Sequence, residues 1–126
     1  MANISNEKLY PREKYLSKLR GFYHECEIIK VITGVRRCGK SSIMKLIIRE
    51  LCEQGVPAGN ILYFNLDKRP YIGITKPEQL DELIEAHYRN GSVQYLFIDE
   101  VQNVTDYETV INSWREEGNL SIFLTG

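Results

Sequence analysis

The chain has 126 residues, of which 43% are hydrophobic, so a single domain with a sizeable apolar core is expected. Its 16 Lys and Arg residues nearly balance 17 Asp and Glu residues, so no broad basic field indicates a nucleic-acid partner. A polar amino terminus and the lack of any long apolar run predict neither a secretory signal nor a membrane span. Three cysteines without metal-site spacing favour a reducing, cytoplasmic setting.

Apolar residues follow strand-like and helix-like spacing in turn, which predicts an α/β fold with parallel strands. Residues 1–25 are expected to form a helical lead-in that begins near Tyr10-Pro11. The segment from Asp67 to Thr75 combines proline, glycine and charge with little periodicity, so it is expected to be a loop. The expected strands are 28–33, 61–66, 94–98 and 120–125, and the expected helices are 40–53, 76–90 and 106–116.

Between the first expected strand and the next helix, Gly34-Val35-Arg36-Arg37-Cys38-Gly39-Lys40-Ser41 matches G-x-x-x-x-G-K-[ST] at every fixed position. The glycines let successive backbone N–H groups turn toward one anion, and the helix adds its positive amino-terminal end. In such a loop the lysine reaches the β- and γ-phosphates, and the hydroxyl after it binds Mg²⁺. The sequence therefore predicts a phosphate-binding loop with Lys40 on the phosphates and Ser41 on magnesium.

A second motif, Tyr95-Leu96-Phe97-Ile98-Asp99-Glu100, is an apolar strand that ends in two carboxylates. Asp99 is expected to hold Mg²⁺, directly or through water, opposite Ser41. Glu100 is placed to polarise a water against the γ-phosphate as a general base. Because a kinase must exclude water, a glutamate beside the magnesium aspartate favours hydrolysis over transfer to another acceptor.

Together, GVRRCGKSS, YLFIDEVQN and IFLTG resemble the prokaryotic AAA-like P-loop ATPases that have an N-terminal ATPase domain and a C-terminal domain of unknown function. The resemblance runs from about Arg12 to Gly126. It implies a three-layer P-loop NTPase core with helices on both faces of a parallel sheet, whose strands, numbered along the chain, lie in the order 1-4-3-2. It also implies Mg-ATP binding by Gly34, Gly39, Lys40, Ser41 and Ser42, with Asp99 on Mg²⁺ and Glu100 as catalytic base.

The resemblance gives roles to two further residues. Thr125 matches the polar sensor position that responds to the γ-phosphate, although a threonine at a strand end is also ordinary strand chemistry. Gln102 fits a DE-x-Q pattern in which it helps to orient water, and a solvated turn glutamine is the alternative. Arg36 and Arg37 could neutralise phosphate charge or contact Glu100, and the alternative is that they point to solvent or to neighbouring acidic residues.

The family pattern continues beyond Gly126, so the chain is expected to be an N-terminal fragment without the lid, the arginine finger and the C-terminal domain of its parent. Arginine fingers contribute about 10³ to 10⁵ in turnover, so such a fragment should bind Mg-ATP and hydrolyse it slowly or not at all. A missing fifth strand would leave residues 28–33 as an open apolar edge, which predicts self-association.

The expected function is ATP hydrolysis that drives a conformational change in a longer protein. A nucleotide-dependent switch or scaffold without significant turnover is the alternative. A small-molecule kinase is a third interpretation, which the lack of a recognisable acceptor pocket or lid disfavours. No N-K-x-D-like stretch for guanine is present, so the family resemblance favours ATP over GTP.

Overall fold

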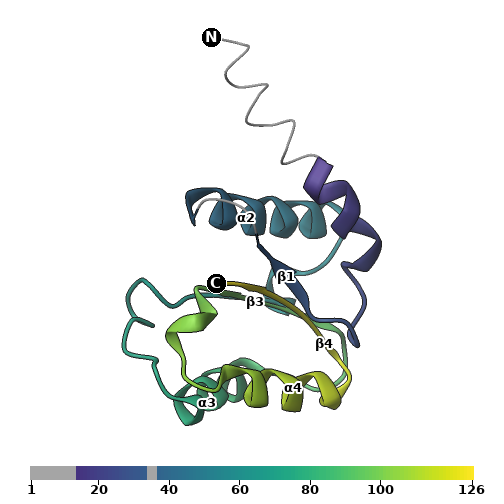
Figure 1. Cartoon of the computed structure of the whole chain (residues 1–126). Helices are drawn as coiled ribbons and strands as arrows, with labels where there is room; N and C mark the ends of the chain where they lie inside the picture. Colours follow the sequence, from purple (N-terminus) through teal and green to yellow (C-terminus); the bar gives the residue numbers. More distant parts are fainter. Residues whose placement is uncertain (1–13, 34–36) are drawn as a thin grey trace.

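The computed structural model describes residues 14–33 and 37–126, and for residues 37–41 it describes the backbone alone. The strands are β1 (Lys30–Ile32), β2 (Ile61–Asn65), β3 (Gln94–Asp99) and β4 (Leu120–Thr125), and the helices are α2 (Arg37–Glu53), α3 (Pro77–His87) and α4 (Tyr107–Glu117). All neighbouring strands are parallel, in the order β1-β4-β3-β2. Helix α2 covers one face of the sheet, and α3 and α4 cover the other (Figure 1). The predicted fold class and strand order are confirmed.

The central strands are buried on both faces. Every residue of β3 and β4 is buried, which explains why both segments read as continuous apolar runs. The outer strand β2 alternates between buried and half-buried residues, as expected for a strand at the edge of a sheet. The apolar pattern therefore distinguishes the middle of this sheet from its edges.

Two apolar clusters hold the three layers together. On the α2 face, Phe97 of β3 and Phe123 of β4 stack with ring centroids 4.4 Å apart, beneath the apolar side of the helix. On the other face, Trp114 of α4 donates a hydrogen bond from Nε1 to Asp81 Oδ1 of α3 at 2.8 Å. The main contributors from the helices are Ile43, Met44, Ile47 and Leu51 on the first face and Leu80, Ile84, Val110, Ile111 and Trp114 on the second.

Several element ends differ from the sequence prediction. Strand β1 covers only Lys30–Ile32 because its pairing with β4 spans those three residues. Helix α3 ends at His87, since Tyr88 already has an extended backbone. Asp106 precedes α4 as predicted, but it is in the left-handed conformation and its side chain makes no capping hydrogen bond. The predicted helix start near Pro11 lies outside the described residues. The first described residues, 14–19, are helical.

The outer edge of β1 is partly occupied by the lead-in. The Tyr15 hydroxyl donates to Val31 O at 3.4 Å and accepts a hydrogen bond from Thr33 N at 3.0 Å. These backbone groups are among those that a further strand would use on this side. The Val31 side chain is still 50% exposed, so an apolar surface remains along the edge, and self-association stays a prediction.

None of the helices in the described part of the chain is long and apolar enough to cross a membrane.

A buried lysine lies at the opposite end of β1 from the loop motif. Lys30 is 3% exposed, and its Nζ donates to Ser121 Oγ at 2.7 Å and to Glu25 O at 2.5 Å. The same ammonium group lies 4.7 Å from the centroid of the Phe123 ring. Loss of hydration on burial lowers the pKa of Lys30 from 10.5 to about 8.

The substitution Lys30→Met should therefore change how stability depends on pH. The folded-state pKa lies below the unfolded value, so the unfolded chain binds more protons between about pH 8 and 10.5, and the Lys30 contribution to stability rises with pH across that window. At about 1.4 kcal/mol per pKa unit, the rise is at most about 3 kcal/mol. Urea unfolding of both proteins from about pH 8 to 10 should show the wild type gaining about 1–3 kcal/mol relative to the variant. A pH-independent difference would contradict a buried ammonium.

Candidate functional site

The predicted site lies at the carboxyl-terminal ends of the parallel strands. Strand β3 ends at Asp99 and β4 ends at Thr125. Strand β1 ends beside β4, with Ile32 opposite Thr125 in register. Only residues 33–36 separate β1 from the start of α2, so the amino-terminal end of α2 lies at the same edge (Figure 1). Ligands of open α/β sheets bind at this end of the strands.

Asp99 is a wholly buried carboxylate at the end of β3. Its side chain is 0% exposed. Oδ1 accepts a hydrogen bond from Thr125 Oγ1 at 2.5 Å, and Oδ2 accepts one from the Tyr63 hydroxyl at 3.0 Å. A buried carboxylate needs such donors, because an unsatisfied charge away from water is costly. The two hydroxyl groups fix the direction in which the carboxylate points.

Thr125 hydrogen-bonds to both adjacent acidic residues, Asp99 and Glu100. Its hydroxyl donates to Asp99 and accepts a hydrogen bond from the Glu100 backbone N–H at 2.9 Å. Glu100 has φ 63° and ψ 48°, a left-handed conformation that costs a non-glycine residue about 1 kcal/mol. The backbone turn separates the two neighbouring carboxylates: Asp99 is buried, whereas Glu100 is half-buried. Thr125 thus contacts both acidic residues, and its response to a γ-phosphate stays a prediction.

Gln102 lies in the 3₁₀ turn Val101–Asn103 directly after Glu100. Its Nε2 donates a hydrogen bond to Glu100 Oε1 at 2.7 Å. The chain after β4 runs close beside this side chain, since a Cβ atom added at Gly126 would collide with Gln102 Oε1. Gln102 therefore contacts the predicted catalytic carboxylate itself, and a role in orienting water stays a prediction.

The phosphate-binding loop lies largely outside what the structure describes. Gly34, Val35 and Arg36 are outside the described residues. For residues 37–41 only the backbone is described, and it forms the first part of α2; the side chains of Arg37, Cys38, Lys40 and Ser41 are not described. Ser42 is half-buried in α2. The roles of Lys40 on phosphate and Ser41 on magnesium therefore stay predictions.

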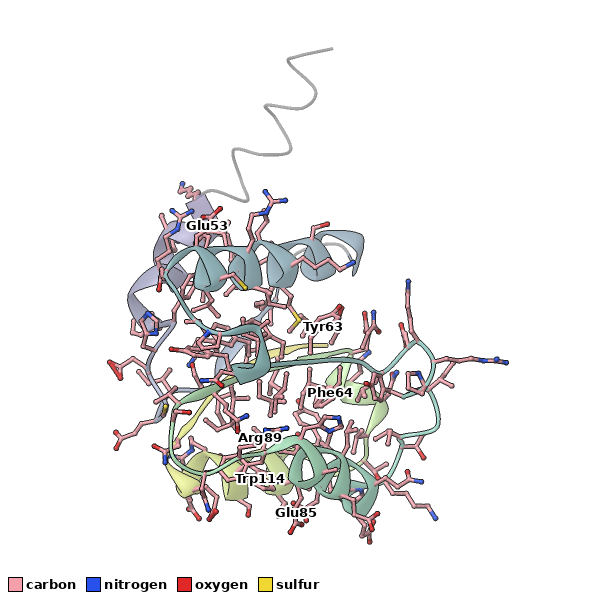
Figure 2. All side chains as sticks on the ribbon, turned by 180° about the vertical axis from the view of Figure 1, so that it is seen from behind. Glu53, Tyr63, Phe64, Glu85, Arg89 and Trp114 are labelled. Atoms are coloured by element: carbon pink, nitrogen blue, oxygen red, sulfur yellow. The ribbon has the colours of Figure 1, made fainter. Side chains whose placement is uncertain are left out.

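Tyr63 is a site residue that the sequence analysis did not identify. It lies in the middle of β2, and its ring is on the face of the sheet covered by α2, whereas Phe64 points to the opposite face (Figure 2). The signal was present in the strand order, which places β2 beside the strand that carries Asp99. A tyrosine in the middle of that neighbouring strand, opposite the residue two before Asp99, was within reach of the carboxylate.

The residues at this edge fit a magnesium ion. Mg²⁺ in nucleotide sites is usually held by one or two protein oxygens, with phosphates and waters completing its shell. Among the side chains that the structure describes, in residues 14–33 and 42–126, no group of three or more His, Cys, Asp or Glu residues could hold a metal by itself. A single oriented carboxylate at a strand end is instead the kind of ligand that suits a nucleotide-bound cation, and the role of Asp99 as that ligand stays a prediction.

The comparison with protein families agrees with this geometry. Residues 27–126 match the AAA domain family, and the chain therefore belongs to that family and has the P-loop NTPase fold. Nucleotide binding of the ATPase type is the general function that this family suggests.

Two curated relatives, both uncharacterized, are similar to the chain. One, from Haemophilus influenzae, is 33% identical over 122 residues, which cover 96% of this chain and 30% of that protein. The other, from Methanocaldococcus jannaschii, is 32% identical over 98 residues, which cover 78% of this chain and 21% of that protein. The chain thus spans less than a third of the length of either relative. No solved structure gives a significant match.

Proposed function

We propose that this chain is the nucleotide-binding core of an ATPase: it binds Mg-ATP, and on its own it hydrolyses ATP slowly or not at all. The observation that carries the proposal is the Thr125 hydroxyl, which contacts the Asp99 carboxylate and the Glu100 backbone at once. The two adjacent carboxylates lie in different environments: Asp99 is buried and held by hydrogen bonds, and Glu100 is half-buried in a left-handed turn. In this arrangement Asp99 would bind the cation, and Glu100 would take a proton from a water molecule.

In this proposal the loop residues hold the triphosphate. Backbone N–H groups from Gly34 to Ser42 would surround the phosphates, and Lys40 would neutralise charge on the β- and γ-phosphates. Asp99 and Ser41 would hold magnesium, which neutralises charge on the phosphate oxygens when bound. The loop set is Gly34, Val35, Arg36, Arg37, Cys38, Gly39, Lys40, Ser41 and Ser42.

Glu100 is the proposed general base. Its carboxylate would accept a proton from the water that attacks the γ-phosphate. Gln102 Nε2 donates to one of its oxygens at 2.7 Å, and this contact gives the glutamate side chain a preferred direction. Thr125 would sense the γ-phosphate by turning its single hydroxyl hydrogen from Asp99 to a phosphate oxygen.

A switch without significant turnover is the second candidate function. It differs from the first only in the absence of significant hydrolysis, and the hydrogen bond from Gln102 to Glu100 is compatible with both. In that case nucleotide binding alone would change the state of the protein.

For a protein as long as the curated relatives, we propose that ATP hydrolysis in this core moves the remaining domains. A C-terminal partner domain and a cytoplasmic location belong to this proposal. Association of two copies along the half-exposed β1 edge is also part of it.

The test follows the terminal phosphate of ATP. The protein is incubated with Mg-ATP labelled at the γ-phosphate, with and without added nucleosides and sugars. Release of labelled inorganic phosphate supports a hydrolase. Transfer of the label to an added acceptor supports a kinase instead. Bound ATP that stays intact supports the switch.

A further inference from the structure

Tyr63 makes a polar contact that neither the loop motif nor the two-carboxylate motif accounts for. It is opposite Phe97 in the register of β2 and β3, and Asn65 is opposite Asp99. The Tyr63 ring lies on the α2 face of the sheet (Figure 2), and its hydroxyl reaches along the strand to donate to Asp99 Oδ2 at 3.0 Å. The residue therefore connects the edge strand with the predicted cation ligand.

The Asp99 carboxylate is held from both sides of its strand. Strand β3 lies between β4 and β2, and each neighbour supplies one hydroxyl group: Thr125 donates to Oδ1 and Tyr63 donates to Oδ2. A carboxylate held at one oxygen can still turn about its Cβ–Cγ bond. A second donor on the other oxygen removes that freedom and defines the plane of the group.

We infer that Tyr63 is a positioning residue that orients Asp99 for Mg²⁺ and so sets how much Mg²⁺ nucleotide binding requires. The inference rests on the proposed function. Partners that hydrogen-bond to a metal ligand fix its direction, and their loss typically costs about 10- to 100-fold in metal affinity. Each Asp99 oxygen can accept more than one hydrogen bond or ligand, so the phenol orients the carboxylate without using up its capacity.

A purely structural role is the competing explanation. In that case the phenol satisfies a buried carboxylate, and its removal lowers stability equally with and without magnesium. A positioning role instead changes the magnesium requirement of ATP binding. The two explanations therefore differ in a quantity that does not depend on catalysis.

The experiment compares wild type with Tyr63→Phe, which removes only the hydroxyl group. ATP binding is measured by equilibrium titration over a range of Mg²⁺ concentrations and in EDTA. The Mg²⁺ concentration at half-maximal binding should rise about 10-fold in the variant, whereas binding in EDTA should not change. Tyr63→Met is a second variant without the hydroxyl, for use if the first fails to fold.

Tyr95→Phe is the matched control. Tyr95 also lies on the α2 face of the sheet, and its hydroxyl hydrogen-bonds to His24 Nδ1 at 2.6 Å, at the far end of β3 from Asp99. Its removal should leave the Mg²⁺ requirement unchanged. An unchanged requirement in the Tyr63 variants, or an equal rise in the control, overturns the inference alone. A wild type that binds no ATP at any Mg²⁺ concentration overturns the proposed function as well.

Discussion

In a protein as long as the curated relatives, replacing Glu100 with Gln is expected to lower the rate of ATP hydrolysis by about 10²- to 10⁴-fold while ATP remains bound. The amide has the shape of the carboxylate but cannot accept the proton of the attacking water. The fold should tolerate the change, because Thr125 holds the backbone N–H of Glu100 and not its side chain. Phosphate release and retained ATP, measured in a single turnover, report the two effects separately.

Glu117→Gln is the matched control for this substitution. Glu117 is exposed at the end of α4, away from the strand ends that carry the site. Its replacement should leave hydrolysis unchanged. A Glu100→Gln protein that hydrolyses ATP at the wild-type rate would show that Glu100 is not the general base. A wild type that binds ATP without hydrolysing it would favour the switch.

Replacing Lys40 with Ala is expected to weaken ATP binding by about 10- to 100-fold. Lys40 is the lysine at the fixed position of the loop motif, and hydrogen bonds to charged groups contribute about 1.5–3 kcal/mol each. An equilibrium titration with Mg-ATP measures the loss directly. Lys45→Ala is the control, because Lys45 is an exposed lysine of the same helix outside the loop motif. An equal loss in both variants would indicate a general charge effect and not a phosphate contact.

The convergence of the site residues could be predicted from the sequence because parallel strands end at one edge of a sheet. An apolar run followed by Asp99 and another ending in Thr125 bring both residues to that edge once the strand order is known. The order itself came from the family resemblance, since local patterns do not encode which strands are neighbours. The structure confirms that order and brings the two side chains to 2.5 Å.

The contacts between side chains could not be predicted in the same way. The Tyr63 hydrogen bond depends on the register between β2 and β3, and the left-handed backbone of Glu100 depends on how the turn fits beside β4. Charged residues are normally exposed, so nothing local marked Lys30 as buried. Tyr15 occupies the β1 edge through a contact between segments 16 residues apart. Each of these features is a tertiary effect.

Thermal unfolding with and without Mg-ATP tests the central claim most directly. A ligand at 100 times its dissociation constant should stabilise the folded chain by about 2.7 kcal/mol. For a domain of this size, that raises the unfolding midpoint by several degrees. The account predicts this shift in the wild type and a much smaller one in Lys40→Ala at the same ATP concentration. No shift in the wild type, or the same shift in both proteins, would contradict a nucleotide site at this loop.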